Sequence, residues 1–166
     1  MRLIFLFFFC LLLKLSIAVT PDTYDLRKLY YYAAANKDSA SKFLMVMENL
    51  DVKTDPLLLC YKGMANLIQA NHSFNPYSKL AFFIKGKDML EKAIMTDPKN
   101  IEICFMRFCV QTNAPFFLGY SMNINSDKLI IIKGWGKLLD LDLKEKIREY
   151  ILTSSSFSPN EKIMFK

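Results

Sequence analysis

The chain has 166 residues, of which 52% are hydrophobic and 23% are charged, and it contains five Gly. This composition is that of one globular domain and excludes a disordered chain or a collagen-like rod. The formal net charge is +6, but the basic residues are spread along the chain and interleaved with acidic ones. That pattern is typical of a solvated surface, so we expect no nucleic-acid partner.

The first 18 residues have the pattern of a signal peptide. A basic N-terminus precedes an unbroken apolar run at residues 3–13, and small residues stand at Ser16 and Ala18. The run is shorter than the roughly 20 residues that cross a bilayer, and the small-x-small spacing is typical of signal cleavage. We predict cleavage after Ala18, leaving residues 19–166 as one exported all-helical domain, periplasmic or secreted, with no membrane span. An uncleaved N-terminal anchor is the alternative.

Helical periodicity covers nearly all of the mature chain. Apolar residues recur at i, i+3, i+4 and i+7, beginning with the stripe Leu26, Leu29, Tyr30 and Ala33. Polar turn formers separate the stripes, in chain order, at residues 36–38, 49–55, 71–76, 97–100, 112–127 and 140–142. These breaks leave about eight predicted helices.

Two proline-containing signatures mark helix starts within this pattern. Asp55-Pro56 is an N-cap followed by Pro at the first helical position, and Ser158 with Glu161 has the spacing of a capping box. Residues 129–132 are rich in β-branched side chains, so a strand is the alternative there. We predict a helix because no partner strand is visible.

Residues 57–98 carry a more specific pattern. Its small and apolar positions are, in order, Leu59, Gly63, Gly86, Leu90, Ala93 and Pro98. The unit resembles the tetratricopeptide repeat, in which small residues let the two helices of a unit pack closely, although the connection at 71–77 makes it longer than the usual repeat of about 34 residues. The resemblance implies an all-α fold in which antiparallel helix pairs stack as a short solenoid.

The whole chain is also similar to a group of small exported bacterial proteins that lack an assigned function. The segments that carry this similarity are residues 61–66, 73–77 and 111–120. The similarity implies a compartment and a fold, and no reaction.

The residue inventory argues against catalysis. His72 is the only histidine, so no His pair or His-containing zinc set can be assembled. After loss of Cys10 with the signal peptide, Cys60, Cys104 and Cys109 lie in apolar helical stripes, which favours buried, unreactive thiols. A disulfide between Cys60 and one of the other two is the alternative. We therefore predict no metal, no cofactor and no enzymatic activity.

Two apolar connections are the candidate partner-binding segments. Phe74 and Tyr77 lie between two helices, and Phe116, Phe117 and Tyr120 lie in the longest gap of the helical pattern. Either these rings fold back to seal the ends of the helical stack, or they form a hydrophobic docking site.

The resemblance to tetratricopeptide repeats adds polar candidates. In such a stack the first helix of each pair lines a concave groove, which would present Asn66, Glu102 and Gln111 to a partner. The function we predict is a helical-repeat interaction module that binds another protein or peptide of the cell envelope. A small-ligand carrier or enzyme with a pocket closed by the aromatic loops is the competing class, and a structural envelope component is the third.

Overall fold

The computed structural model describes residues 22–166, so the predicted signal peptide, including Ser16 and Ala18, lies outside the described residues. Within that part of the chain, eight α-helices and one 3₁₀ helix are present and no strand is. The elements are α1 (Thr23–Ala35), α2 (Lys37–Asn49), α3 (Pro56–His72), α4 (Pro76–Thr96), α5 (Ile101–Asn113), η1 (Phe116–Leu118), α6 (Ile124–Trp135), α7 (Leu141–Thr153) and α8 (Pro159–Ile163).

Side-chain caps explain where most of the helices begin. Asp55 accepts hydrogen bonds from the backbone N–H groups of Leu57 and Leu58, and α3 starts at Pro56 as predicted. The predicted capping box of Ser158 and Glu161 opens α8. Each such cap satisfies N–H groups that have no partner within the helix. Asparagine or aspartate caps α2, α4, α5 and α7 in the same way, with the side chains of Asn36, Asn75, Asn100 and Asp140.

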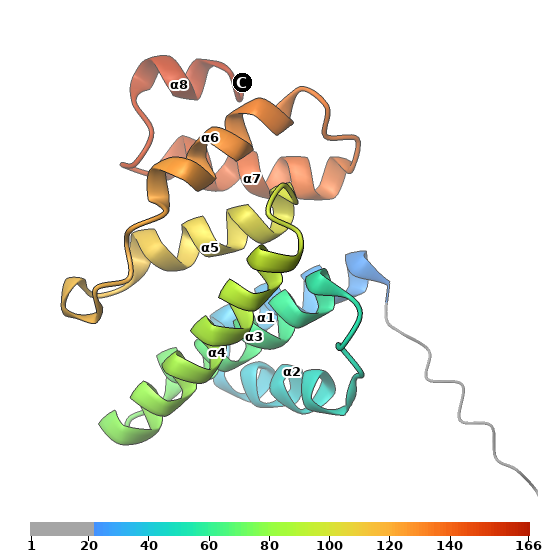
Figure 1. Cartoon of the computed structure of the whole chain (residues 1–166), viewed down its shortest axis with the longest axis vertical. Helices are drawn as coiled ribbons and strands as arrows, with labels where there is room; N and C mark the ends of the chain where they lie inside the picture. The colour runs from blue at the N-terminus through green and yellow to red at the C-terminus, as the bar shows by residue number, and fades with distance from the viewer. Residues whose placement is uncertain (1–21) are drawn as a thin grey trace, which may run out of the picture.

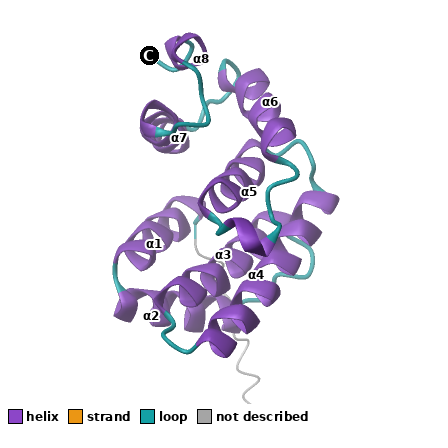
Figure 2. Ribbon diagram, turned by 90° about the vertical axis from the view of Figure 1, so that its left-hand side faces the viewer, coloured by secondary structure: helices purple, strands orange, loops and turns teal. Residues whose placement is uncertain are grey.

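The predicted architecture is confirmed: antiparallel helix pairs stack as a short, tetratricopeptide-like solenoid. The pairs α1/α2, α3/α4 and α5/α6 pack closely within themselves, and α2 and α3 join the first two pairs. The first helices of successive pairs, α1, α3, α5 and α7, run in the same direction, from right to left in Figure 1. Figure 2 views the stack from the edge where these helices end, with α1 to α4 below and α5 to α8 above.

Two glycines bring α3 and α4 into close contact. A Cβ atom at Gly63 would lie 2.8 Å from the carbonyl oxygen of Gly86, and one at Gly86 would lie 2.6 Å from the carbonyl oxygen of Gly63 and 2.7 Å from Cγ of Leu67. No real Cβ atom tolerates such distances, so this contact requires glycine on both helices. These two small residues of the pattern at 57–98 therefore lie at the contact between α3 and α4.

The interior consists of two apolar clusters that meet at α5. The first contains buried side chains of α1 to α4 together with Ile103, Cys104 and Met106 of α5. The second contains Phe105 and Phe108 of α5 with buried residues of α6, α7 and the C-terminal segment, namely Ile131, Leu143, Ile147, Ile151, Phe157 and Phe165. An ion pair also joins α5 to α6: Arg107 of α5 binds Asp127 of α6 through two hydrogen bonds of 2.9 and 2.7 Å.

Replacing Gly63 or Gly86 by Ala should destabilise the protein. The added methyl group meets backbone carbonyl oxygen at 2.8 or 2.6 Å, and the resulting strain of about 1–3 kcal/mol exceeds the roughly 1 kcal/mol that Ala gains over Gly in a helix. We expect each variant to melt several degrees lower by circular dichroism. Gly136→Ala is the control, because a Cβ atom there meets no atom within 4 Å. Equal melting temperatures for all three variants would contradict the close contact.

Candidate binding site

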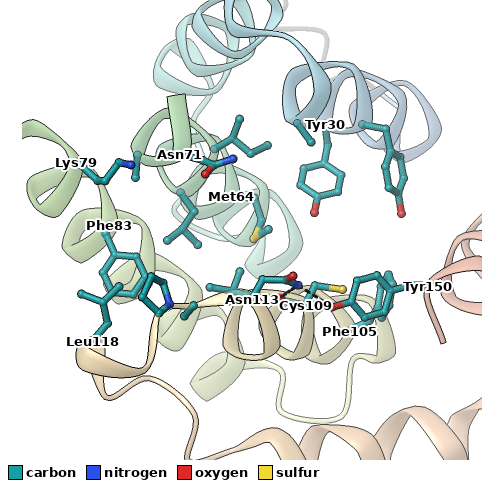
Figure 3. A pocket seen from close by; sticks show the side chains of 18 of the residues that line it. Tyr30, Met64, Asn71, Lys79, Phe83, Phe105, Cys109, Asn113, Leu118 and Tyr150 are labelled. Atoms are coloured by element: carbon teal, nitrogen blue, oxygen red, sulfur yellow. Dashed lines mark hydrogen bonds between the residues drawn. The ribbon is translucent and has the colours of Figure 1, made fainter. Parts of the chain in front are cut away.

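The four first helices surround a large cavity. Its volume is about 1060 Å³, and residues of α1, α3, α5 and α7 line it together with the first turns of α4 and the η1 connection. Figure 3 shows Tyr30 of α1, Met64 of α3, Phe83 of α4 and Phe105 of α5 converging on this space. The volume lies at the upper end of the range of about 300–1,000 Å³ that is usual for small-molecule sites.

Most of the lining is apolar, and the polar groups are few. Figure 3 shows the hydroxyl group of Tyr30 pointing into the cavity. On α5, the side-chain amide of Asn113 donates a 2.7 Å hydrogen bond to the hydroxyl oxygen of Tyr150. Lys79 of α4 and Lys146 of α7 also line the cavity. A mainly apolar wall with a few placed polar groups is the usual composition of a ligand-binding pocket.

The ionisable groups of the wall are neutral apart from its lysines and one glutamate. Burial raises the pKa of the Tyr30 hydroxyl well above its usual value, and burial raises the pKa of Tyr31 likewise. The thiol of Cys109 also has a raised pKa because of burial. At neutral pH these groups carry protons and no charge, so they offer a ligand hydrogen-bond donors without electrostatic repulsion.

A buried arginine holds together the other ends of the same helices. Nε and Nη2 of Arg27 on α1 donate hydrogen bonds of 2.9 and 3.1 Å to the carboxylate of Glu102 on α5. Arg27 also pairs with Asp140, the N-cap of α7, and with Asp142 in its first turn. The hydroxyl group of Tyr61 on α3 donates to Glu102 at 2.6 Å. This Arg27 network therefore joins all four first helices near their starting ends.

Four of the five predicted aromatic residues stand out from the surface. Phe74, Tyr77, Phe116 and Phe117 are 90%, 87%, 97% and 83% exposed, respectively, and we call them the aromatic rim. Phe74 lies in the connection after α3, Tyr77 in the first turn of α4, and Phe116 and Phe117 in η1, which follows α5; Phe117 also lines the cavity. Figure 1 shows the ends of α3 and α5 at the left edge of the stack. Side chains this exposed do not seal the stack, so the sealing interpretation is wrong for these four residues.

Tyr120 is the residue that folds back. Its ring packs edge-on against Phe83 with centroids 6.0 Å apart, and its hydroxyl group donates a hydrogen bond to Glu91. Glu91 in turn accepts a 2.8 Å hydrogen bond from Arg107. Tyr120 therefore anchors the long connection to α4 and α5, which is the sealing role that the sequence left open.

The expected polar groove residues lie in the interior and do not line the cavity. Asn66 is fully buried and donates to the carbonyl oxygen of Lys62 at 2.8 Å, while Gln111 accepts a 3.0 Å hydrogen bond from the backbone N–H of Asn123. Glu102 belongs to the Arg27 network. The expectation that Asn66, Glu102 and Gln111 face a groove is wrong, because each occupies a helix face that packs against a neighbouring element.

The histidine and the three cysteines, which could act in catalysis, instead have structural roles. Nε2 of His72 lies 3.1 Å from the carbonyl oxygen of Ala33, which ties the end of α3 to the end of α1. The three cysteines of the described chain are free, and burial raises the pKa of all three thiols, that of Cys104 to about 12. Among residues 22–166, no three His, Cys, Asp or Glu side chains are grouped as metal ligands, and no helix is long and apolar enough to span a membrane.

Sequence reasoning missed most of the cavity wall. Tyr30, Met64 and Phe105 occupy positions in apolar stripes, and helical periodicity alone does not indicate a cavity. The adjacent tyrosines Tyr30 and Tyr31 near the end of α1 were the one available signal, because their hydroxyl groups need a polar or aqueous neighbour.

Comparison of the chain with known protein families, curated proteins and solved structures finds no match.

Replacing Arg27 by Met should lower the free energy of unfolding by about 3–5 kcal/mol, because Glu102 would stay buried without its cationic partner. Both side chains are almost inaccessible, with exposed fractions of 2% and 6%. Urea denaturation measures the change, and Lys28→Met, at the exposed neighbouring position, is the matched control. The double variant Arg27→Met/Glu102→Gln should regain much of the loss. A double variant no more stable than the single one would contradict the role assigned to the ion pair.

Proposed function

We propose that this protein is an exported helical-repeat module that binds another protein or peptide of the cell envelope at the aromatic rim. The observation that carries the proposal is the exposure of Phe74, Tyr77, Phe116 and Phe117, between 83% and 97%. Exposed aromatic side chains favour partner binding, because aromatic side chains supply much of the energy of protein interfaces.

The position of the rim supports this function. Phe117 borders the cavity, and Pro76, Lys79 and Leu80 from the first turns of α4 line it as well. A partner segment lying across the rim can therefore contact the exposed rings and place an apolar side chain in the space behind them. Lys37, the first residue of α2, places its ammonium 5.0 Å from the centre of the Phe74 ring.

Binding in place of catalysis is part of the same proposal. His72 is engaged with the backbone of Ala33, and the raised pKa of each described thiol leaves it protonated at neutral pH and weakly nucleophilic. These groups support the interior of the fold.

A small-ligand carrier is the second candidate function. The open cavity of about 1060 Å³ favours it, because apolar walls and a few polar groups line a space of ligand size. This function depends on the interior wall of the cavity, whereas partner binding depends on the exposed rings of the rim. Phe117 borders both, so variants at other positions of the wall test ligand binding.

Changing both Phe116 and Phe117 to Ala should weaken capture of an envelope partner at least tenfold without lowering the melting temperature. Each aromatic anchor of an interface contributes more than about 1 kcal/mol, while substitutions of exposed side chains alter stability by roughly 0.5 kcal/mol or less. The measurement is cross-linking of the tagged mature chain in its native envelope, with a melting curve for each chain.

The matched control removes equally exposed apolar side chains elsewhere. Met95 and Leu139 are 81% and 90% exposed, and the double variant Met95→Ala/Leu139→Ala should capture the partner as the unaltered chain does. Equal capture by all three chains would contradict docking at the rim. A large fall in the melting temperature of the Phe116→Ala/Phe117→Ala variant would show that the rings are structural.

Export predicts a mature chain that begins at Val19. The intact mass of the protein purified from its native cells should correspond to residues 19–166, since small residues at Ser16 and Ala18 suit signal cleavage. Ala18→Arg should block processing, whereas Thr20→Ser, beyond the cut, should leave it unchanged. A native chain that retains residues 1–18 would contradict the proposed cleavage.

A further inference from the structure

The cavity wall carries more positive than negative charge. Two lysines and one glutamate line it, and Nζ of Lys146 lies 2.9 Å from the carboxylate of Glu149. Lys79 forms no ion pair with any residue in the described part of the chain. Its ammonium is therefore the uncompensated charge of the wall, and opposite charge on a ligand would be attracted to it.

A neutral hydrogen-bond donor stands beside this charge. Figure 3 shows Asn71, from the last turn of α3, on the same side of the cavity as Lys79 from the first turns of α4. An ammonium and an amide N–H group together match the two oxygens of one carboxylate. The carboxylate of the wall, that of Glu149, pairs with Lys146. Both residues lie on α7, in the other half of the stack.

The rest of the space suits a hydrocarbon chain. Met64, Phe83 and Phe105 form the wall between the Lys79 side and the Tyr150 side in Figure 3. Methionine and phenylalanine offer apolar, adaptable surfaces to a flexible chain. The tyrosine hydroxyl and thiol groups of the wall add no negative charge there, because burial keeps them protonated.

We propose that this cavity binds a single-chain fatty carboxylate, with the carboxylate on Lys79 and Asn71 and the hydrocarbon chain against Met64, Phe83 and Phe105. The proposal rests on the second candidate function, ligand binding in the cavity, and does not depend on partner docking at the aromatic rim.

The test is calorimetric titration of the full mature chain with dodecanoate and decanoate, each below its micelle concentration, and with dodecanol below its solubility limit. Dodecanoate should bind with a stoichiometry of one. Decanoate should bind about tenfold more weakly, because two fewer methylene groups are buried. Dodecanol should bind more weakly than dodecanoate, because it lacks the negative charge. Equal affinities for dodecanoate and dodecanol, or no saturable binding, would overturn the proposal.

Two pairs of variants locate the ligand. Ala34 and Ala35 are neighbouring exposed residues of α1, but only Ala34 lines the cavity. Ala34→Trp should therefore abolish dodecanoate binding, while Ala35→Trp should leave it unchanged.

Lys79→Met should weaken the binding of dodecanoate about fivefold, the effect of losing one solvent-accessible ion pair, and leave the binding of dodecanol unaffected. Lys92→Met, at an exposed position of α4 outside the cavity, is its control.

The outcomes separate this proposal from partner binding. Full dodecanoate affinity in the Ala34→Trp variant, or equal loss in both tryptophan variants, would overturn binding in the cavity. An unchanged dodecanoate affinity in Lys79→Met would overturn the placement of the carboxylate. None of these results alters the expected behaviour of the Phe116→Ala/Phe117→Ala variant, whose rings stand at the rim.

Discussion

The guanidinium group of Arg27 fixes the relative positions of the four first helices. It binds Glu102 of α5 and the two aspartates at the start of α7, and Tyr61 of α3 completes the network through Glu102. Arg27 and Glu102 are the buried charges of this network, and each can stay buried because it has an opposite charge beside it. The network joins the helices at one end, and the cavity lies between the same helices toward their other end, so the ion pairs and the cavity are two parts of one arrangement.

Side-chain size determines where this stack is tight and where it is open. Gly63 and Gly86 let the backbones of α3 and α4 touch, and the carbonyl oxygen of each glycine occupies the space of the other's absent Cβ. Elsewhere on α3, Met64 and Ile68 line the cavity instead. One helix thus has a face that excludes any ligand and a face that can receive one.

Much of the fold could be predicted because its signals are local. Pro56 after an aspartate and the Ser158-Glu161 capping box specify helix starts through bonds within four residues, and the two glycines lie in a repeat pattern that implies close packing. The interior polar residues could not be placed in this way. Glu102 is buried because Arg27, 75 residues away, binds it, and Gln111 is buried because it accepts from Asn123. Periodicity also does not distinguish an apolar face that packs from one that borders a cavity, so it could not place Phe105 and Met64 on the cavity wall.

The position of α5 has a consequence for how the protein unfolds. Ile103, Cys104 and Met106 belong to the first apolar cluster, whereas Phe105 and Phe108 belong to the second. In a stack of repeats each unit contacts only its neighbours, and separate ends can unfold independently when the coupling between units is weak. Here a single helix contributes buried side chains to both clusters, so melting of either cluster exposes part of the other's interior. The two halves of the molecule therefore behave as one cooperative unit, although the sequence is organised in pairs.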